Sequence, residues 1–155
     1  MSVAMQRDIG AFLDGMPIPA VDPLAITAGG GGDGAEQSGE WMDRQDRLSG
    51  KLIIAFVATL AQDETLSIAA NMQDASDDSG TGAADYGDAV ANAVVATGGT
   101  GGSTERGIVT LDVDLSAAAR YVRAQMTPTM SAASTDVATT AAVFVTSGGR
   151  AYPLS

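Results

Sequence analysis

Cysteine and histidine are both absent from this chain of 155 residues. Without cysteine, disulfide bonds and thiolate chemistry are excluded, and the redox compartment cannot be inferred from the sequence. Without histidine, the chain lacks the commonest general base and the commonest ligand of transition metals. These absences favour packing and binding over catalysis, and we expect no catalytic residue, no resident metal and no cofactor.

Basic residues are scarce as well: eight Lys and Arg stand against 19 Asp and Glu, a formal net charge of −11. Nucleic-acid binding needs a face rich in Lys and Arg that neutralises phosphates, so we expect no nucleic-acid partner. No apolar run approaches the roughly 20 residues that span a bilayer. Residues 1–17 also lack the basic and apolar regions of a secretory signal. The sequence therefore predicts a soluble protein with no membrane partner.

Aromatic residues make up only 5% of the chain, whose apolar content depends mainly on Ala and Val. Such a composition is typical of a thin core between two sheets of short side chains. The 19 glycines cluster in segments that resemble loops, which favours many short strands joined by turns.

The clearest β pattern begins after Lys51. Alternate side chains of residues 52–60 form one apolar face, made of Leu52, Ile54, Phe56, Ala58 and Leu60. The opposite face, from Ile53 to Thr59, is apolar too, which is typical of a strand covered on both sides. A turn at AQDE leads to residues 65–72, which alternate again, so the two segments form a predicted hairpin.

Further segments repeat this alternation. Residues 109–115 place apolar side chains at every second position, residues 121–126 do so after a break, and residues 139–149 close the pattern. About seven strands at this spacing predict an all-β antiparallel sandwich, of jelly-roll or Ig-like type, over residues 49–155. We expect Met72, Met126 and Met130 to fill its core.

Residues 1–48 differ from the rest and are predicted to form an extended N-terminal arm with Gly- and Pro-rich loops. Pro17, Pro19 and Pro23 exclude a continuing helix. The segment GGGGDG, residues 29–34, is a flexible or sharply turning loop. Two interpretations stay open: the apolar residues of the arm lie on the surface of a neighbour, or they pack on the chain's own domain.

The best candidate for an ion site is an acidic loop over residues 73–89. It contains five carboxylates, Asp74, Asp77, Asp78, Asp85 and Asp88, which could together surround one Ca²⁺. Their spacing does not match the twelve-residue calcium loop of helix–loop–helix proteins. A solvated acidic loop is the commoner outcome, and we assign no metal ligand there.

A carboxylate pair for glycoside hydrolysis would have to come from Asp112 and Asp114, which project from one strand face about 7 Å apart. Nothing near them in the sequence would bury one carboxyl and raise its pKa, so we interpret them as solvent-facing. Arg120 and Arg123 point to opposite faces of their strand. We expect Arg123 to stack near Tyr121 or to pair with one of the two aspartates.

Several of these segments together resemble a known family. KLIIAFVATLAQDETLSIAANMQD, a loop that ends in ADYGDA, GIVTLDVDLSAAARYVRAQMTPTMSAASTD and a final AVFVTSGG are similar to the small head-decoration (cement) proteins of tailed bacteriophages. GEWMDRQDR resembles the lead-in to their first strand. The resemblance covers roughly residues 39–149. The DLS…RYVR segment also resembles jelly-roll modules that bind carbohydrate.

The resemblance implies a structural virion protein, made in the host cytoplasm, that binds the outer surface of the capsid and stabilises the lattice of the major capsid protein. Such proteins commonly sit as homotrimers at three-fold positions. If arms are exchanged between protomers, we expect the partner contacts to come from Ile9, Phe12, Leu24, Ile26 and Trp41. The alternative is a carbohydrate-binding module with Tyr86 as its exposed platform, and a hydrolase is a much weaker third hypothesis.

Overall fold

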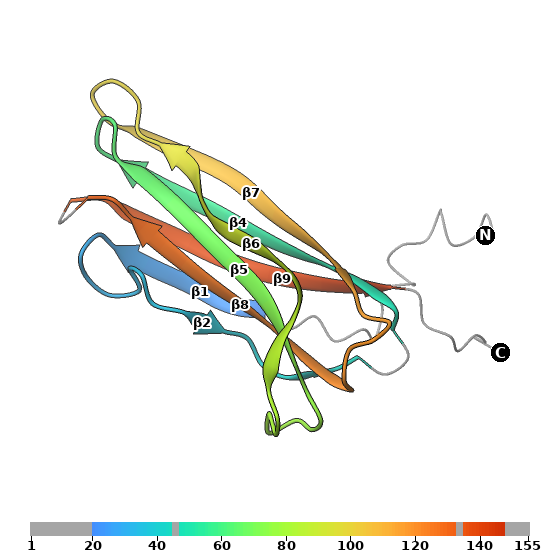
Figure 1. Ribbon diagram of the computed structural model, residues 1–155. Coiled ribbons are helices and arrows are strands. Elements are labelled where there is room, and N and C mark those ends of the chain that lie inside the picture. The colour runs from blue at the N-terminus through green and yellow to red at the C-terminus, as the bar shows by residue number, and fades with distance from the viewer. Residues whose placement is uncertain (1–19, 45–46, 133–134, 148–155) are drawn as a thin grey trace, which may run out of the picture.

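The computed structural model describes residues 20–44, 47–132 and 135–147, and its regular elements there are all strands (Figure 1). The strands are β1 (Ala20–Thr27), β2 (Gln37–Ser38), β3 (Met42–Asp43), β4 (Ser49–Leu60), β5 (Thr65–Ala75), β6 (Ala84–Thr97), β7 (Ser103–Asp114), β8 (Tyr121–Met130) and β9 (Val137–Ser147). No helix in this part of the chain is long and apolar enough to cross a membrane.

The strands form two antiparallel sheets that pack face to face. Sheet A has the order β1-β9-β4-β7, and sheet B has the order β2-β8-β5-β6, with β3 also paired to β8. If β2 and β3 are counted as one interrupted strand, the eight strands in chain order are arranged 1-8-3-6 in sheet A and 2-7-4-5 in sheet B. This order is that of a jelly roll. The predicted all-β antiparallel sandwich is confirmed, and the topology selects the jelly roll over the Ig-like alternative.

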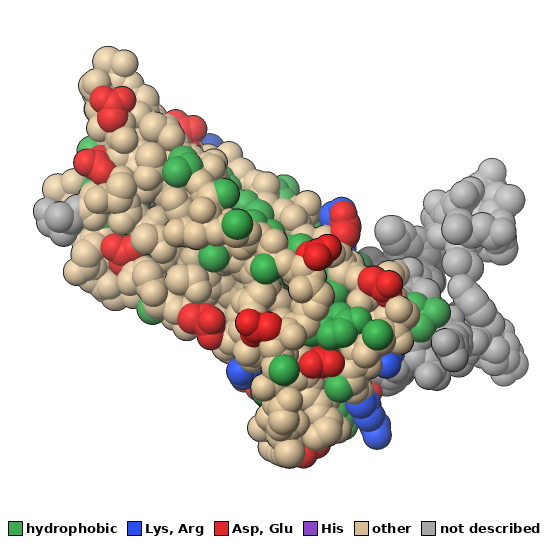
Figure 2. All heavy atoms as spheres, viewed as in Figure 1, with side chains coloured by type: hydrophobic (Ala, Val, Ile, Leu, Met, Phe, Trp, Pro, Cys, Tyr) green, Lys and Arg blue, Asp and Glu red, His purple; other side chains and the backbone are tan. Residues whose placement is uncertain are grey.

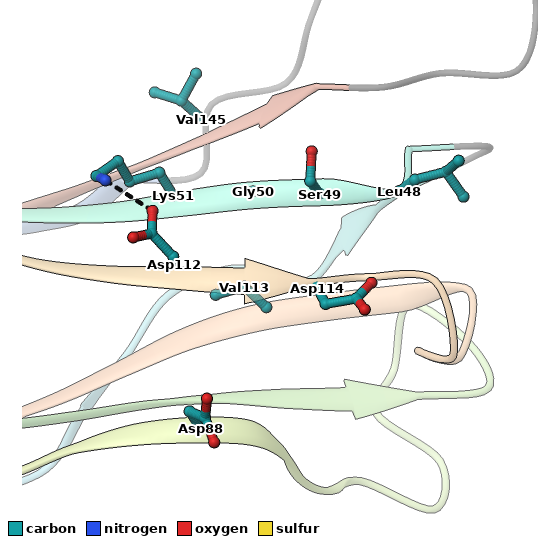
Figure 3. Close-up of a pocket in the computed structure, with 9 residues that line it drawn as sticks. All are labelled: Leu48, Ser49, Gly50, Lys51, Asp88, Asp112, Val113, Asp114 and Val145. Atoms are coloured by element: carbon teal, nitrogen blue, oxygen red, sulfur yellow. Dashed lines mark hydrogen bonds and ion pairs between the residues drawn. The ribbon is translucent and has the colours of Figure 1, made fainter.

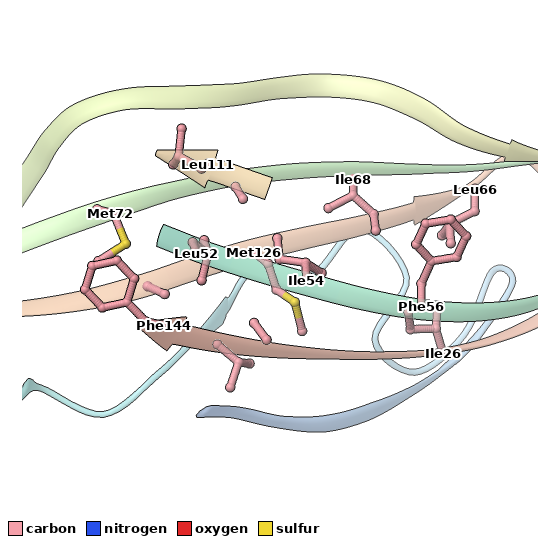
Figure 4. Packing of buried hydrophobic residues seen from close by; sticks show 14 of the residues in the cluster. Ile26, Leu52, Ile54, Phe56, Leu66, Ile68, Met72, Leu111, Met126 and Phe144 are labelled. Carbon is pink, nitrogen blue, oxygen red and sulfur yellow. The ribbon is translucent and has the colours of Figure 1, made fainter. Parts of the chain in front are cut away.

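The core lies between the sheets and follows from the period-two alternation of the strands. Inward positions of β4 and β5 are buried and outward positions are not. Figure 4 shows the packed side chains, among them Leu52, Ile54, Phe56, Leu66, Ile68, Met72, Met126 and Phe144. Met72, Met126 and Met130 are all buried, as expected for core residues.

Both phenylalanine rings of this core lie against a glycine of a neighbouring strand. A Cβ atom at Gly107 would come within 2.6 Å of the Phe56 ring, and one at Gly50 within 2.3 Å of the Phe144 ring. Phe56 and Gly107 face each other directly across β4 and β7. The two glycines therefore provide the space that lets a core of short side chains hold two aromatic rings.

The prediction that β4 is covered on both sides is wrong for the single chain. Ala55 is exposed and Val57 is 42% exposed on the outer face of sheet A. The physical reason is the number of layers: in a sandwich of two sheets, each sheet has only one face in the core.

The described part of the predicted arm joins the sheets. β1 pairs with β9 along Ala20↔Val143 to Thr27↔Val137, interrupted by an irregularity between Val21 and Leu24 that contains Pro23. β2 and β3 pair with β8. The rest of the predicted arm, residues 1–19 and 45–46, lies outside the described residues.

The strand β6 also departs from regular pairing. Its register with β5 shifts at three places between Thr65↔Thr97 and Asp74↔Ala84. The extra residues of β6 make this edge strand of sheet B bend and twist locally.

Candidate interaction surfaces

The outer face of sheet A is apolar at its centre. Five large hydrophobic side chains are exposed in the described part of the chain, and four of them lie on this face: Val57 (42%), Ile108 (67%), Val137 (48%) and Val143 (38%). The strand register adds further apolar residues to this surface: Ile53 lies beside Val143, and Ala55 lies between Ile108 and Ala141. We call this surface the apolar face. A contiguous exposed apolar patch of this kind marks an interaction site more often than isolated residues do.

Charged side chains of both signs border the apolar face on β4 and β7. Lys51 donates to Asp112 at 2.7 Å, and both side chains are open to solvent. Arg106 and Asp114 project from β7 on the same side of the sheet, since they share the parity of Asp112. These four charges cancel, in contrast to the strongly acidic chain as a whole.

The outer face of sheet B carries a hydrogen-bonded network instead. Asn71 donates to Asp85 (3.0 Å) and to Gln125 (3.1 Å), Gln73 donates to Asp85 (3.1 Å), and Arg123 donates twice to Gln73 (3.0 and 2.8 Å). Gln125 is only 3% exposed. It donates to Glu36 at 2.6 Å and to Ser38 at 3.0 Å. We call these seven residues, which lie on β2, β5, β6, β8 and the loop before β2, the polar network.

Trp41 completes this face. The guanidinium of Arg123 lies over the Trp41 ring, 4.5 Å from its centroid. A Cβ atom at Gly80 would approach the indole nitrogen within 2.8 Å, so the loop that follows β5 packs closely on the ring. Trp41 therefore makes contacts within its own chain, by a cation–π contact and by loop packing.

Figure 2 shows separate acidic side chains dispersed over the visible surface, with few basic ones between them.

A hollow of about 590 Å³ lies at one end of the sandwich, between β6 and the ends of β4 and β7 (Figure 3). Asp88, Asp112 and Asp114 line it together with Lys51. Asp112 is paired with Lys51, and the backbone N–H of Ser116 donates to Asp114 at 2.8 Å and lowers the pKa of that carboxyl. The hydrogen bond from Ser116 favours the ionised form of Asp114, whereas a general acid needs a carboxyl held protonated.

The predicted acidic loop is shorter in the structure, because β5 extends to Ala75 and β6 begins at Ala84. Asp77 stabilises the remaining turn by accepting hydrogen bonds from Thr81 N (2.9 Å), Ser79 N (3.1 Å) and Ser79 Oγ (2.8 Å). These hydrogen bonds, foremost the one from Thr81, lower the pKa of Asp77 to about 2. Asp74 accepts from Ala119 N at 2.7 Å. Among the described residues no group of three or more potential ligands could hold a metal ion.

The predicted roles of Tyr86 and Arg123 need correction. Tyr86 lies in β6, is half-buried against the core, and donates to the carbonyl of Asp114 at 2.7 Å, so it is not an exposed platform. Arg123 pairs with Gln73 and Trp41 rather than with Asp112 or Asp114, because those aspartates belong to the other sheet. Arg120 donates to Asp43 at 2.6 Å, which raises the pKa of the guanidinium.

The predicted arm contacts lie in different surroundings. Ile26 is 1% exposed within the chain's own core, and Leu24 packs against that core. Trp41 belongs to the polar network side of sheet B, while Ile9 and Phe12 lie outside the described residues. Sequence reasoning recognised that residues 52–60 are apolar on both faces but did not expect one of these faces to be exposed.

Comparisons with known proteins add little. No family model matches the sequence, and no curated protein matches it. Two solved structures of infectious bursal disease virus, of the Gx and Gt strains, superpose on the chain with TM-scores of 0.49 and 0.42, each at 12% identity. They cover 88% and 86% of this chain, which in turn spans 34% of the length of each viral chain. Neither likeness assigns a family or a function.

Proposed function

We propose that the protein is a structural component of a virus particle, which binds the outer surface of a tailed-phage capsid and stabilises the lattice of its major capsid protein. The observation that supports this proposal is a jelly-roll sandwich with an exposed apolar face on sheet A. Jelly rolls serve repeatedly in viral capsids and in lectins. Fold analogy alone does not assign a function, so the weight rests on the apolar face, which marks a chain that associates with other protein chains.

The mechanism of such a protein is multivalent. Each copy contributes a modest contact, and many copies on one lattice together resist separation of the capsid subunits. The resemblance of residues 39–149 to head-decoration proteins implies a homotrimer at three-fold positions. A rigid sandwich suits this role because its contact surface needs no ordering when it binds.

The test is co-sedimentation of the purified protein with expanded heads of the phage whose genome encodes it, prepared without this protein. We expect saturable binding at a fixed number of copies per head, together with a higher temperature of head disruption. Heads that bind no protein, or bind it without a gain in thermal stability, would contradict the proposal.

The second candidate function is carbohydrate binding, which the outer face of sheet B favours through Trp41 and the amides of the polar network. Aromatic rings and amides are the groups that recognise sugars, but here they already bond to one another. A glycan array decides this question. Retention of the wild-type protein that Trp41→Ala abolishes and Tyr86→Phe preserves would support a lectin, and absence of retention would exclude it for the glycans displayed.

A further inference from the structure

We propose that the apolar face of sheet A is covered by a second copy of this chain, packed sheet to sheet about a twofold axis. The inference concerns the self-association of the proposed capsid-binding protein and replaces the homotrimer that the resemblance implies with a twofold pair. It rests on the proposed function only for its biological setting. Ile53, Ala55, Val57, Ile108 and Val143 form the centre of that face. Four features of the face support a copy of the same chain as its occupant.

The first feature is size. From Lys51 to Thr59 the face runs about 30 Å along the strands, and four strands make it about 19 Å wide. Two such faces in contact bury upward of about 1,100 Å² in total, which exceeds the roughly 1,000 Å² that a specific interface needs. A second sheet of the same dimensions covers the face completely.

The second feature is shape. The outward positions of β4 and β9 are mainly Ala, Val and Thr, with Ala55 and Ala141 side by side at the centre. Short side chains make a smooth sheet surface, and two sheets with the same twist are complementary when they pack about 30° apart. Isologous pairing about a twofold axis requires a patch that fits itself. Sheets stacked in this way lie about 10 Å apart, as in the interior of a sandwich.

The third feature is charge. Two copies that each carry a net charge of −11 repel one another. The charges that border the apolar face on β4 and β7 sum to zero, so this face allows close approach at little electrostatic cost. A twofold axis that crosses the strands sets the two β7 strands antiparallel. Arg106 near one end of β7 then approaches the end that carries Asp112 and Asp114.

The fourth feature is the sequence of β4. Residues 52–60 are apolar on both faces, a pattern of strands buried on both sides. The single chain buries one of these faces and leaves Val57 42% exposed. A stacked copy buries the other, which accounts for a pattern that the two-layer fold leaves unexplained.

The experiment measures native mass by light scattering over a dilution series, on the full chain and on two variants. Ile108→Lys places a charge in the apolar face. Val94→Lys is the matched control, since Val94 is 58% exposed and lies on β6, which belongs to sheet B. Both variants reduce the net negative charge equally, so weaker association of Ile108→Lys cannot come from charge repulsion between whole chains.

We expect the wild type and Val94→Lys to have a mass near twice the 15.5 kDa of the chain. Ile108→Lys should associate at least about tenfold more weakly. A wild-type monomer at every concentration overturns the proposal. So does equal association of all three proteins, which would place the contact on another surface. A trimer that Ile108→Lys dissociates overturns the twofold arrangement as well.

A second measurement tests the same face if Ile108→Lys does not fold. The chain has no cysteine, so Ala55→Cys introduces a single thiol at the centre of the face, and Ala69→Cys introduces one on the outer side of sheet B. A short bis-maleimide should link two copies of Ala55→Cys and leave Ala69→Cys unlinked. The opposite pattern, or equal linking of both, overturns the proposal.

Failure of this inference and failure of the proposed function are distinguishable. A folded monomer that still binds phage heads removes the second copy and keeps the capsid role. A dimer that depends on Ile108 but ignores phage heads keeps the interface and removes the capsid role.

Discussion

The outer faces of the two sheets differ although both sheets follow the same alternation. On sheet B, outward side chains bond to one another across strands, from Glu36 through Gln125 and Asn71 to Asp85. On sheet A, outward side chains are short and mainly apolar, and the ion pair between Lys51 and Asp112 lies at the margin. One face is satisfied within the chain, and the other has polar groups at its border and apolar groups at its centre. The contrast shows that a sandwich can bond the polar groups of one outer surface within the chain while its other outer surface stays apolar and exposed.

The largest effect is expected from breaking the polar network at its buried member. Gln125→Ala removes the three hydrogen bonds of Gln125 with Glu36, Ser38 and Asn71, and it leaves a cavity where a side chain only 3% exposed had packed. We expect the free energy of unfolding to fall by about 2–3 kcal/mol, measured by urea denaturation. The matched change on sheet A, Thr110→Ala, should cost less than about 0.5 kcal/mol. Equal losses would contradict the contrast between the faces.

Arg123→Ala should have the next largest effect. It removes the two hydrogen bonds to Gln73 and uncovers one side of the Trp41 ring. We expect a loss of about 1–2 kcal/mol, because the site is only half-buried, and a red shift of tryptophan fluorescence. The chain has one tryptophan, so the emission reports this contact alone. Unchanged emission would show that the guanidinium does not shield the ring in solution.

A smaller effect is expected from the ion pair at the margin of the apolar face. Lys51→Met removes the pair with Asp112, whose side chain is 81% exposed. Exposed pairs contribute less than about 1 kcal/mol, and salt screens them. The difference in stability between wild type and Lys51→Met should therefore vanish at high salt. A difference that persists in high salt would show that the stem of Lys51, rather than its charge, matters.

The smallest effect concerns Asp77, in the turn between β5 and β6. Its pKa is about 2 in the folded protein, below its ordinary value of 3.8. The stabilisation is therefore complete above about pH 4 and is lost as the pH falls from 3.8 towards 2. Asp77→Asn should make the thermal melting temperature fall less steeply over this interval. Asp78→Asn removes the same charge from the same turn, and an equal change in both variants would contradict the assignment to Asp77.

Local pattern was enough to predict the inward side of each strand. Alternation in residues 52–60 and 65–72 identified the core residues, since period two is a property of the strand itself. The arm could not be predicted from pattern, because whether β1 pairs with β9 depends on contacts between residues more than a hundred positions apart. The polar network escaped prediction for the same reason: Gln125 meets Glu36 only after three strands have found their register.

Tyr86 shows a different limit. Its position within an acidic, Gly-rich segment suggested an exposed ring, but the irregular strand β6 turns it towards the end of β7. An irregularity of this kind leaves no signal in composition. Residues 73–89 therefore looked like one long loop, although the structure has strand at both ends of that stretch.

The irregular edges of the sandwich limit how it can aggregate. Sheets that expose straight edge strands add further strands and grow into fibrils. Here Pro23 and its irregularity interrupt β1 at an edge of sheet A, and three register shifts bend β6 at an edge of sheet B. Lateral growth by strand addition is therefore disfavoured at both places. A protein built in this way can be crowded at high density and still associate through a face, where contact stops once the face is covered.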